Sequence, residues 1–272
     1  MRALLLAATA SLLSPGWDTG ADHRERCGRL AASVTIRTGA ELTPGDELRG
    51  GRIVACVERP ELATLLVAVE SARAAGYVRP IVVHTELRWG RRSPLLVAYH
   101  RSTGTLLAGG ATRALDETVW LHELAHMAMD GTRPAGALAA RLVDAVEEGA
   151  ADYFAAALSG RPSVGSLSGG ERRDLVSPAA PGASEWAALA VPGAFSSHRF
   201  GAILAAQLLD AEPRPGELLR DLIQSLGDDE PWPAASSPRA VVDELVRRSP
   251  LRSRRTLEAA LLGWLPRELA RP

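Results

Sequence analysis

Apolar and polar positions divide the chain into a first half with short strands and a second half dominated by helices. Runs rich in β-branched residues, bounded by turn residues, predict strands at residues 33–38, 51–57, 80–87, 93–100 and 103–110. Because a Ser-Thr-Gly turn separates the last two strands, we expect them to form a hairpin. Apolar residues at helical spacing predict helices over residues 60–76 and 115–129.

Helical periodicity continues almost to the end of the chain. Further helices are predicted at residues 136–158, 196–210, 216–227, 237–249 and 253–266. A stretch rich in Gly, Ser and Pro, residues 159–195, holds one short helical candidate around 184–190. The pattern therefore predicts an α+β fold in which a small N-terminal β-sheet with helices precedes a mainly helical half. We expect an N-terminal subdomain over residues 22–130 and a helical C-terminal subdomain over residues 131–272.

The first 21 residues have the features of an export signal. Arg2 is followed by an apolar run from Ala3 to Leu13, and a Pro-Gly pair then ends the run. We therefore expect residues 1–21 to be a signal peptide and the protein to be exported to the periplasm or the extracellular space; a buried N-terminal helix is the alternative. No later segment reaches the roughly 18–20 apolar residues that a membrane span requires.

Composition and charge exclude some classes of partner. Of the 272 residues 46% are hydrophobic and 23% are charged, and the net charge is −1. These values are ordinary for a globular protein and provide no excess of positive charge that would attract nucleic acid or an anionic membrane. The two cysteines, Cys27 and Cys56, could pair in an exported protein or remain separate buried thiols.

The segment WLHELAHMAMDG, residues 120–131, carries the strongest chemical signal of the sequence. His122 and His126 are four residues apart, so a helix presents both imidazoles on one face. Glu123 lies about 100° further around the helix and flanks the same point. Two neutral imidazoles with an open position suit Zn²⁺, and a neighbouring glutamate can take a proton from an attacking water. The segment therefore predicts a metal site, against the alternative of an ordinary amphipathic helix.

A tetrahedral zinc site with one open position needs a third protein ligand. The segment DAVEEGAADYF, residues 144–154, supplies a candidate in Glu148, which shares a helix face with Asp152. Glu148 can bind the metal while Asp152 accepts the other N–H of a ligand histidine and fixes its orientation. Glu147 has Ala151 in the corresponding supporting position, which favours Glu148.

Three further residues bear on this assignment. Gly149 lies in the middle of the predicted helix, where glycine costs about 1 kcal/mol relative to alanine, so we expect a close packing contact there. Asp130 and Asp144 are fallback ligands, because a carboxylate can bind zinc wherever the fold brings it close. The alternative for this acidic segment is a solvated helix face.

The order HELAH, then EEGAAD, resembles the gluzincin metallopeptidases, the thermolysin- and fungalysin-like group of HExxH enzymes. In that group a second helix carries a Glu ligand with an Asp four residues later. Twenty-one residues separate His126 from Glu148, which is compatible with a short turn between antiparallel helices. The metzincin pattern does not fit, because it requires Gly in place of Met129 and His in place of Thr132. The resemblance implies a zincin-like fold, one Zn²⁺ held by His122, His126 and Glu148, and a peptide or protein substrate.

The resemblance also implies roles for residues around the metal. Glu123 would act as general base, removing a proton from the attacking water and passing it to the leaving amine. The segment SSHRFGAILAAQLLD, residues 196–210, resembles a gluzincin helix that a histidine opens. His198 then corresponds to the histidine that hydrogen-bonds the developing oxyanion. The tyrosine that shares this task in the family has no match, and we expect Tyr153 to be a packing residue.

Two alternatives differ in class from a zinc metallopeptidase. A catalytically inactive metallopeptidase-like domain would bind peptides or a partner protein without depending on Glu123. A helical structural module with a coincidental HELAH would bind no stoichiometric zinc. Structural or solvent roles are expected for His23, His84 and His100, because a complete ligand set already exists.

Overall fold

The computed structural model describes residues 34–38, 62–76, 81–87, 97–101, 104–109, 116–165, 172–179, 181–191, 195–233 and 237–270. The expected signal peptide, His23, both cysteines and the strand predicted at 51–57 lie outside the described residues.

A mixed sheet of four strands forms the N-terminal part of the described chain. The strands are β1 (Val34–Thr38), β2 (Ile81–Leu87), β3 (Val97–His100) and β4 (Thr105–Gly109), and their order in the sheet is β1-β2-β4-β3. β1, β2 and β4 run parallel, whereas β3 is antiparallel to β4. The predicted hairpin is confirmed, with Gly104 at a φ of 61° in its turn, a left-handed conformation that glycine adopts readily. Among the described strands, β3 lies at one edge of the sheet.

Helices make up most of the remaining described chain. They are α3 (Leu62–Ala74), α4 (Glu117–Ala128), α5 (Ala137–Ser159), the short α6 (Ala183–Ala187), the 3-10 turn η2 (Ala188–Ala190), α7 (Ser197–Ala211), α8 (Glu217–Leu226), α9 (Pro238–Arg248) and α10 (Arg254–Trp264). A two-residue ladder joins β5 (Ser163–Val164) to β6 (Arg173–Asp174). The predicted α+β class, with a small sheet before a helical half, is therefore confirmed. Among the described helices, none combines the length and the apolar character needed to cross a bilayer.

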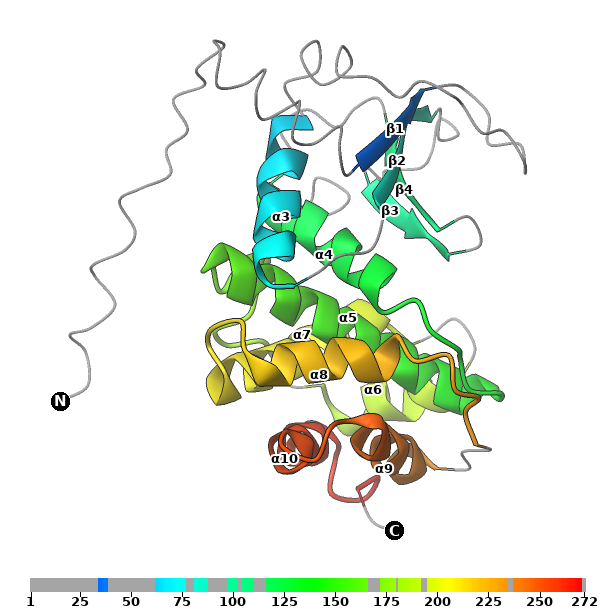
Figure 1. Cartoon of the computed structure of the whole chain (residues 1–272). Helices are drawn as coiled ribbons and strands as arrows, with labels where there is room; N and C mark the ends of the chain where they lie inside the picture. Colours follow the sequence, from blue (N-terminus) through cyan, green and yellow to red (C-terminus); the bar gives the residue numbers. More distant parts are fainter. Residues whose placement is uncertain are drawn as a thin grey trace, which may run out of the picture.

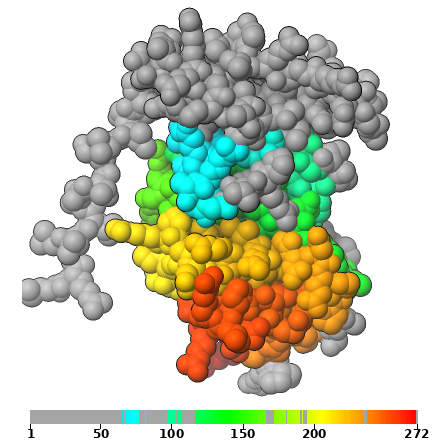
Figure 2. Space-filling model, in the orientation of Figure 1, coloured from blue at the N-terminus to red at the C-terminus, as the bar shows by residue number. Residues whose placement is uncertain are grey.

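The elements are stacked in an order that follows the chain (Figure 1). The sheet and α3 lie at one end, α4 runs beneath them, and α5, α7 and α8 form the next layer. α9 and α10 close the opposite end, and the space-filling view shows the same progression from cyan to red on one face (Figure 2). α4 thus lies between the sheet layer and α5, and it contacts α3, β3 and α5.

Two glycines let α5 and α7 approach each other at the level of Glu148. A Cβ atom on Gly201 would lie 2.6 Å from the backbone nitrogen of Gly149 and 2.7 Å from Cβ of Glu148. A Cβ atom on Gly149 would lie 2.8 Å from the carbonyl oxygen of Gly201. The close packing contact that the mid-helix glycine predicted is therefore confirmed, and it fixes the position of α5 beside the N-terminal turns of α7.

This contact predicts that Gly201→Ala destabilises the protein. The added methyl group would meet backbone atoms of α5, which can only move together with the helix, so we expect a loss of about 1–3 kcal/mol in the free energy of unfolding. Gly263→Ala is the matched control, because its Cβ would lie 3.5 Å from Oε1 of Gln207, an ordinary contact. Since alanine is the better helix former, Gly263→Ala is expected to stabilise slightly. Urea unfolding of both variants measures the difference, and equal effects would contradict the close approach.

Candidate metal centre

α4 is buried on nearly all sides, including its polar positions. His122 is fully buried, Glu123 is 3% exposed, and the surrounding apolar positions belong to the core. Asp116 caps the helix, since its Oδ1 accepts a hydrogen bond of 3.0 Å from the backbone N–H of Thr118. An ordinary amphipathic helix would turn its charged residues to solvent. α4 instead directs a histidine and a glutamate into the protein, so these groups need partners there.

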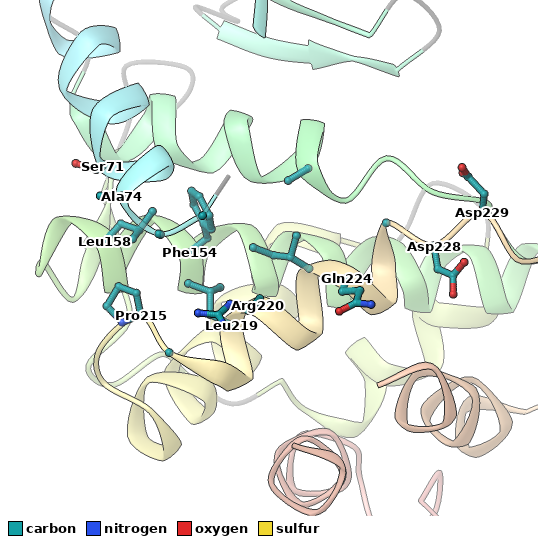
Figure 3. Close-up of a pocket in the computed structure, with 16 residues that line it drawn as sticks. Ser71, Ala74, Phe154, Leu158, Pro215, Leu219, Arg220, Gln224, Asp228 and Asp229 are labelled. Carbon is teal, nitrogen blue, oxygen red and sulfur yellow. The ribbon is translucent and has the colours of Figure 1, made fainter. Parts of the chain in front are cut away.

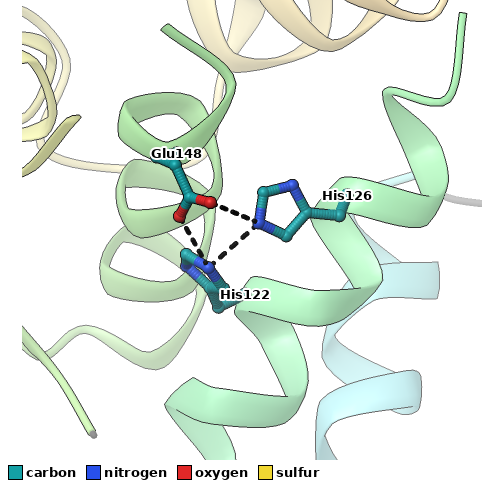
Figure 4. Close-up of side chains that lie close together, drawn as sticks. All are labelled: His122, His126 and Glu148. Atoms are coloured by element: carbon teal, nitrogen blue, oxygen red, sulfur yellow. Dashed lines mark hydrogen bonds and ion pairs between the residues drawn. The ribbon is translucent and has the colours of Figure 1, made fainter. Parts of the chain in front are cut away.

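Three side chains from α4 and α5 converge on one point (Figure 4). The Nε2 atoms of His122 and His126 are 3.0 Å apart. The Oε2 atom of Glu148 lies 3.2 Å from Nε2 of His122, and its Oε1 atom lies 3.6 Å from Nε2 of His126. The sequence placed the two histidines on one helix face, and the fold brings the predicted third carboxylate to them.

The spacing of these atoms suits a divalent ion. Ligand atoms about 2.0–2.1 Å from a tetrahedral zinc lie roughly 3.3 Å from one another, and the observed separations of 3.0–3.6 Å bracket this value. Oε2 of Glu148 is buried and, although it lies 3.2 Å from Nε2 of His122, it is not aligned for a hydrogen bond with any described residue. A buried carboxylate oxygen without a partner is costly unless a cation or a proton compensates it. His122, His126 and Glu148 could therefore hold a metal ion.

The other ring nitrogen of His122 is held by Asp152. Nδ1 of His122 lies 2.8 Å from Oδ1 of Asp152, and both side chains are fully buried. This contact is the one predicted for Asp152, and it directs Nε2 of His122 toward Glu148. The same Oδ1 atom accepts a hydrogen bond of 2.6 Å from the guanidinium of Arg173 in β6. No local pattern in the sequence pointed to Arg173, because it reaches the site from a separate segment.

Glu147 has a structural partner set that the sequence did not reveal. Its carboxylate is buried and accepts hydrogen bonds from the guanidinium groups of Arg101, at 2.7 and 3.0 Å, and of Arg133. Its Oε1 atom also lies 3.4 Å from Nδ1 of His126. Glu147 is therefore placed to orient His126, as Asp152 orients His122. The sequence pattern had rejected Glu147 as a metal ligand and had given it no other role.

Glu123 is held against the edge strand. Its Oε2 atom accepts a hydrogen bond of 2.5 Å from the backbone N–H of Tyr99 in β3. The Tyr99 hydroxyl in turn donates to Oδ2 of Asp130 at 2.5 Å, and Oδ1 of Asp130 lies 2.7 Å from Nε of Arg101. Burial raises the pKa of Glu123 above the ordinary value of a glutamate, and the neighbouring histidines oppose this shift. Asp130, a fallback ligand, is thus engaged away from the three converging side chains.

Without a metal ion, the imidazoles and the Glu148 carboxylate strongly shift one another's pKa values. Burial alone would lower the pKa of His126, but the Glu148 carboxylate raises it well above the ordinary value. Burial alone would raise the pKa of Glu148, but the adjacent imidazoles lower it well below the ordinary value. Glu148 and the imidazoles thus stabilise each other's charged forms, whereas the two histidines disfavour each other's protonation, so the site favours a bound cation, either a proton or a metal ion.

His198 lies at the same site, in the first turn of α7. Its Nδ1 atom is 3.5 Å from Oε1 of Glu148, and its ring centroid is 6.3 Å from that of His122. Burial lowers the pKa of His198 below the ordinary value, which favours the neutral ring. Tyr153 is buried elsewhere, and its hydroxyl lies 3.0 Å from the carbonyl oxygen and Oε2 of Glu212. The packing role expected of Tyr153 is therefore confirmed.

A cavity of about 420 Å³ opens onto these groups. It is lined by β3, α4, α5 and the start of α7, and its polar lining includes Glu123, both α4 histidines, Asp144, Glu148 and His198. Residues far apart in the sequence thus meet at one cavity that holds titratable groups.

Two other histidines do not line this cavity. His100 is exposed at the end of β3, and the side chain of His84 lies outside the described residues.

A larger cavity of about 1120 Å³ lies between α3, α5 and α8 (Figure 3). Apolar side chains such as Phe154, Leu158 and Leu219 line much of it, with Gln224 and Asp228 toward one end. None of the three converging metal-ligand candidates lines it. The candidate metal ligands therefore line the smaller of the two cavities.

In comparisons with protein-family models, curated proteins and solved structures, nothing matches this chain.

Proposed function

We propose that this protein is a zinc-dependent metallopeptidase of the gluzincin type with a zincin-like fold. The observation that carries the proposal is the convergence of His122, His126 and Glu148 beside the buried carboxylate of Glu123. Two imidazoles and one carboxylate are a ligand set typical of catalytic zinc, which keeps a fourth position open. A zinc ion held there would polarise a carbonyl group and lower the pKa of a bound water to about 7.

The residues of the chain divide the remaining tasks of peptide hydrolysis. Glu123 takes a proton from the water that attacks the peptide carbonyl and delivers it to the amine that leaves. Its hydrogen bond from the Tyr99 N–H holds the carboxylate in place for both transfers. His198, whose Nδ1 lies 3.5 Å from Oε1 of Glu148, donates an N–H to the carbonyl oxygen as negative charge develops on it.

The edge strand supports a peptide as substrate. Val97, Ala98 and Tyr99 of β3 line the cavity, and among the described strands β3 has a neighbour on one side only. An extended peptide can therefore pair with the free side of β3 and lie across the metal centre. Because the Tyr99 N–H already bonds Glu123, the pairing would use the backbone groups of the residues before it.

Metal content tests the proposal first. We expect about one zinc per chain after purification, because three preorganised ligands share one buried centre. Removal with a chelator should abolish peptide hydrolysis and lower the melting temperature by roughly 5–10 °C, since an ion bound only to the folded state stabilises it. Added zinc should restore both. Elemental analysis, a peptide-library assay and a thermal melt measure these outcomes, and a metal-free protein that hydrolyses peptides would exclude the proposal.

A further inference from the structure

Asp144 is an acidic side chain of the cavity that the mechanism does not use. It lies on α5 one turn before Glu148, so Asp144, Glu148 and Asp152 follow one another along one helix face. Glu148 and Asp152 both face His122. Asp144 is exposed, lines the same cavity, and makes no hydrogen bond or ion pair within the described parts of the chain. It is also absent from the group that could hold the metal ion.

The other charges around the cavity are compensated. Arg101 is the one arginine among the described residues that line it, and its guanidinium binds Asp130 and Glu147. Arg133 also binds Glu147. These four groups balance one another, so neither guanidinium is directed to Asp144. The cavity therefore presents an acidic group that neither guanidinium hydrogen-bonds, although both positive charges lie near enough to favour its charged form.

The surroundings of Asp144 favour a positive partner. Although its side chain reaches the cavity, partial loss of contact with water and the negative charges of Glu147 and Glu148 raise the pKa of Asp144 above the ordinary value of an aspartate. The positive charges of Arg133 and Arg101 offset this shift only in part. A cation arriving from the substrate side would relieve this repulsion, whereas an anion would add to it. The carboxylate is accessible from the cavity that holds Glu123, so a group bound to it would belong to a molecule at the metal centre.

We propose that Asp144 is a specificity-determining residue that binds a cationic group of the substrate, either a basic side chain or the free amino terminus. The inference rests on the proposed peptidase function, because it concerns the substrate of that same site. Arginine, lysine and an α-ammonium group share the chemistry that Asp144 recognises, a positive charge with N–H donors.

Matched peptides separate the two sources of positive charge. One pair differs only in arginine against its neutral isostere citrulline, and a second pair differs only in a free against an acetylated amino terminus. Zinc-loaded wild type is expected to prefer the charged member of one pair by roughly fivefold in kcat/KM, the effect of a charged hydrogen bond at an accessible site. In Asp144→Asn the ratio for that pair should fall close to one, through KM rather than kcat.

Asp210→Asn is the matched control, since Asp210 is an exposed acid on α7 that does not line the cavity. This variant should keep the wild-type ratio, which separates local recognition from the change in net charge. Anisotropy titrations of the same peptides, labelled, with Glu123→Gln protein give a binding readout without cleavage. In these titrations the preference for the charged peptide should again depend on Asp144.

The outcomes distinguish this inference from the proposed function. If wild type cleaves the peptides but Asp144→Asn keeps the same charge ratio, the role of Asp144 is wrong while the peptidase stands. If wild type cleaves no member of either pair, the peptidase proposal fails, and the binding titrations then decide on Asp144 alone. Equal binding of charged and neutral peptides would overturn the role.

Discussion

Replacing Glu123 with glutamine is expected to reduce kcat on a peptide substrate by roughly a hundredfold to ten-thousandfold, the range for loss of a general base. The amide cannot take the proton of the attacking water, but its oxygen can still accept the hydrogen bond from the Tyr99 N–H. Because Glu123 is not one of the three converging side chains, the variant should keep its zinc. Steady-state kinetics measure the loss in kcat, and elemental analysis of the same preparation measures the retained zinc.

The same variant separates an enzyme from an inactive relative. A catalytically idle peptide-binding domain would show no hydrolysis in wild type, and Glu123→Gln would change its peptide affinity little. A variant that loses zinc along with activity would instead show that Glu123 supports the metal, and its role as base would then be unsupported. Chelator-treated wild type is the reference for that case.

Replacing Glu148 with glutamine is expected to remove stoichiometric zinc. The substitution deletes the negative charge that faces both imidazoles and leaves an amide, a poor zinc ligand, at the same place. The two histidines that remain form an incomplete site, so hydrolysis should fall with the metal. Dialysis against a zinc buffer of fixed free concentration, followed by elemental analysis, measures the loss.

Glu147→Gln is the matched comparison, because it removes one carboxylate charge from the adjacent position of the same helix. Glu147 lies 3.4 Å from Nδ1 of His126, so its loss should weaken zinc binding by about 10–100-fold, the usual effect of a group that orients a ligand. It also deprives Arg101 and Arg133 of their shared partner, so the melting temperature should fall. If Glu147→Gln lost zinc and Glu148→Gln retained it, the assignment of the third ligand would be reversed.

The sequence by itself determined the features that depend on local periodicity. A helix repeats every 3.6 residues, so the spacing of His122 and His126 was enough to place both rings on one face. The same argument put Glu148 and Asp152 on one helix face, and both face His122 in the structure. The α+β class also followed from the succession of strand and helix patterns.

Only the tertiary structure decided which distant segments meet. Spacing within one helix cannot say that β6 brings Arg173 to Asp152, or that the Tyr99 backbone bonds Glu123. The sequence pattern also rejected Glu147, because its two arginine partners come from the residue after β3 and from the connection before α5. Such contacts depend on how whole elements pack, down to the approach of α5 and α7 at two glycines. Local sequence fixes the direction of a side chain on its own element, whereas packing between elements fixes what that side chain touches.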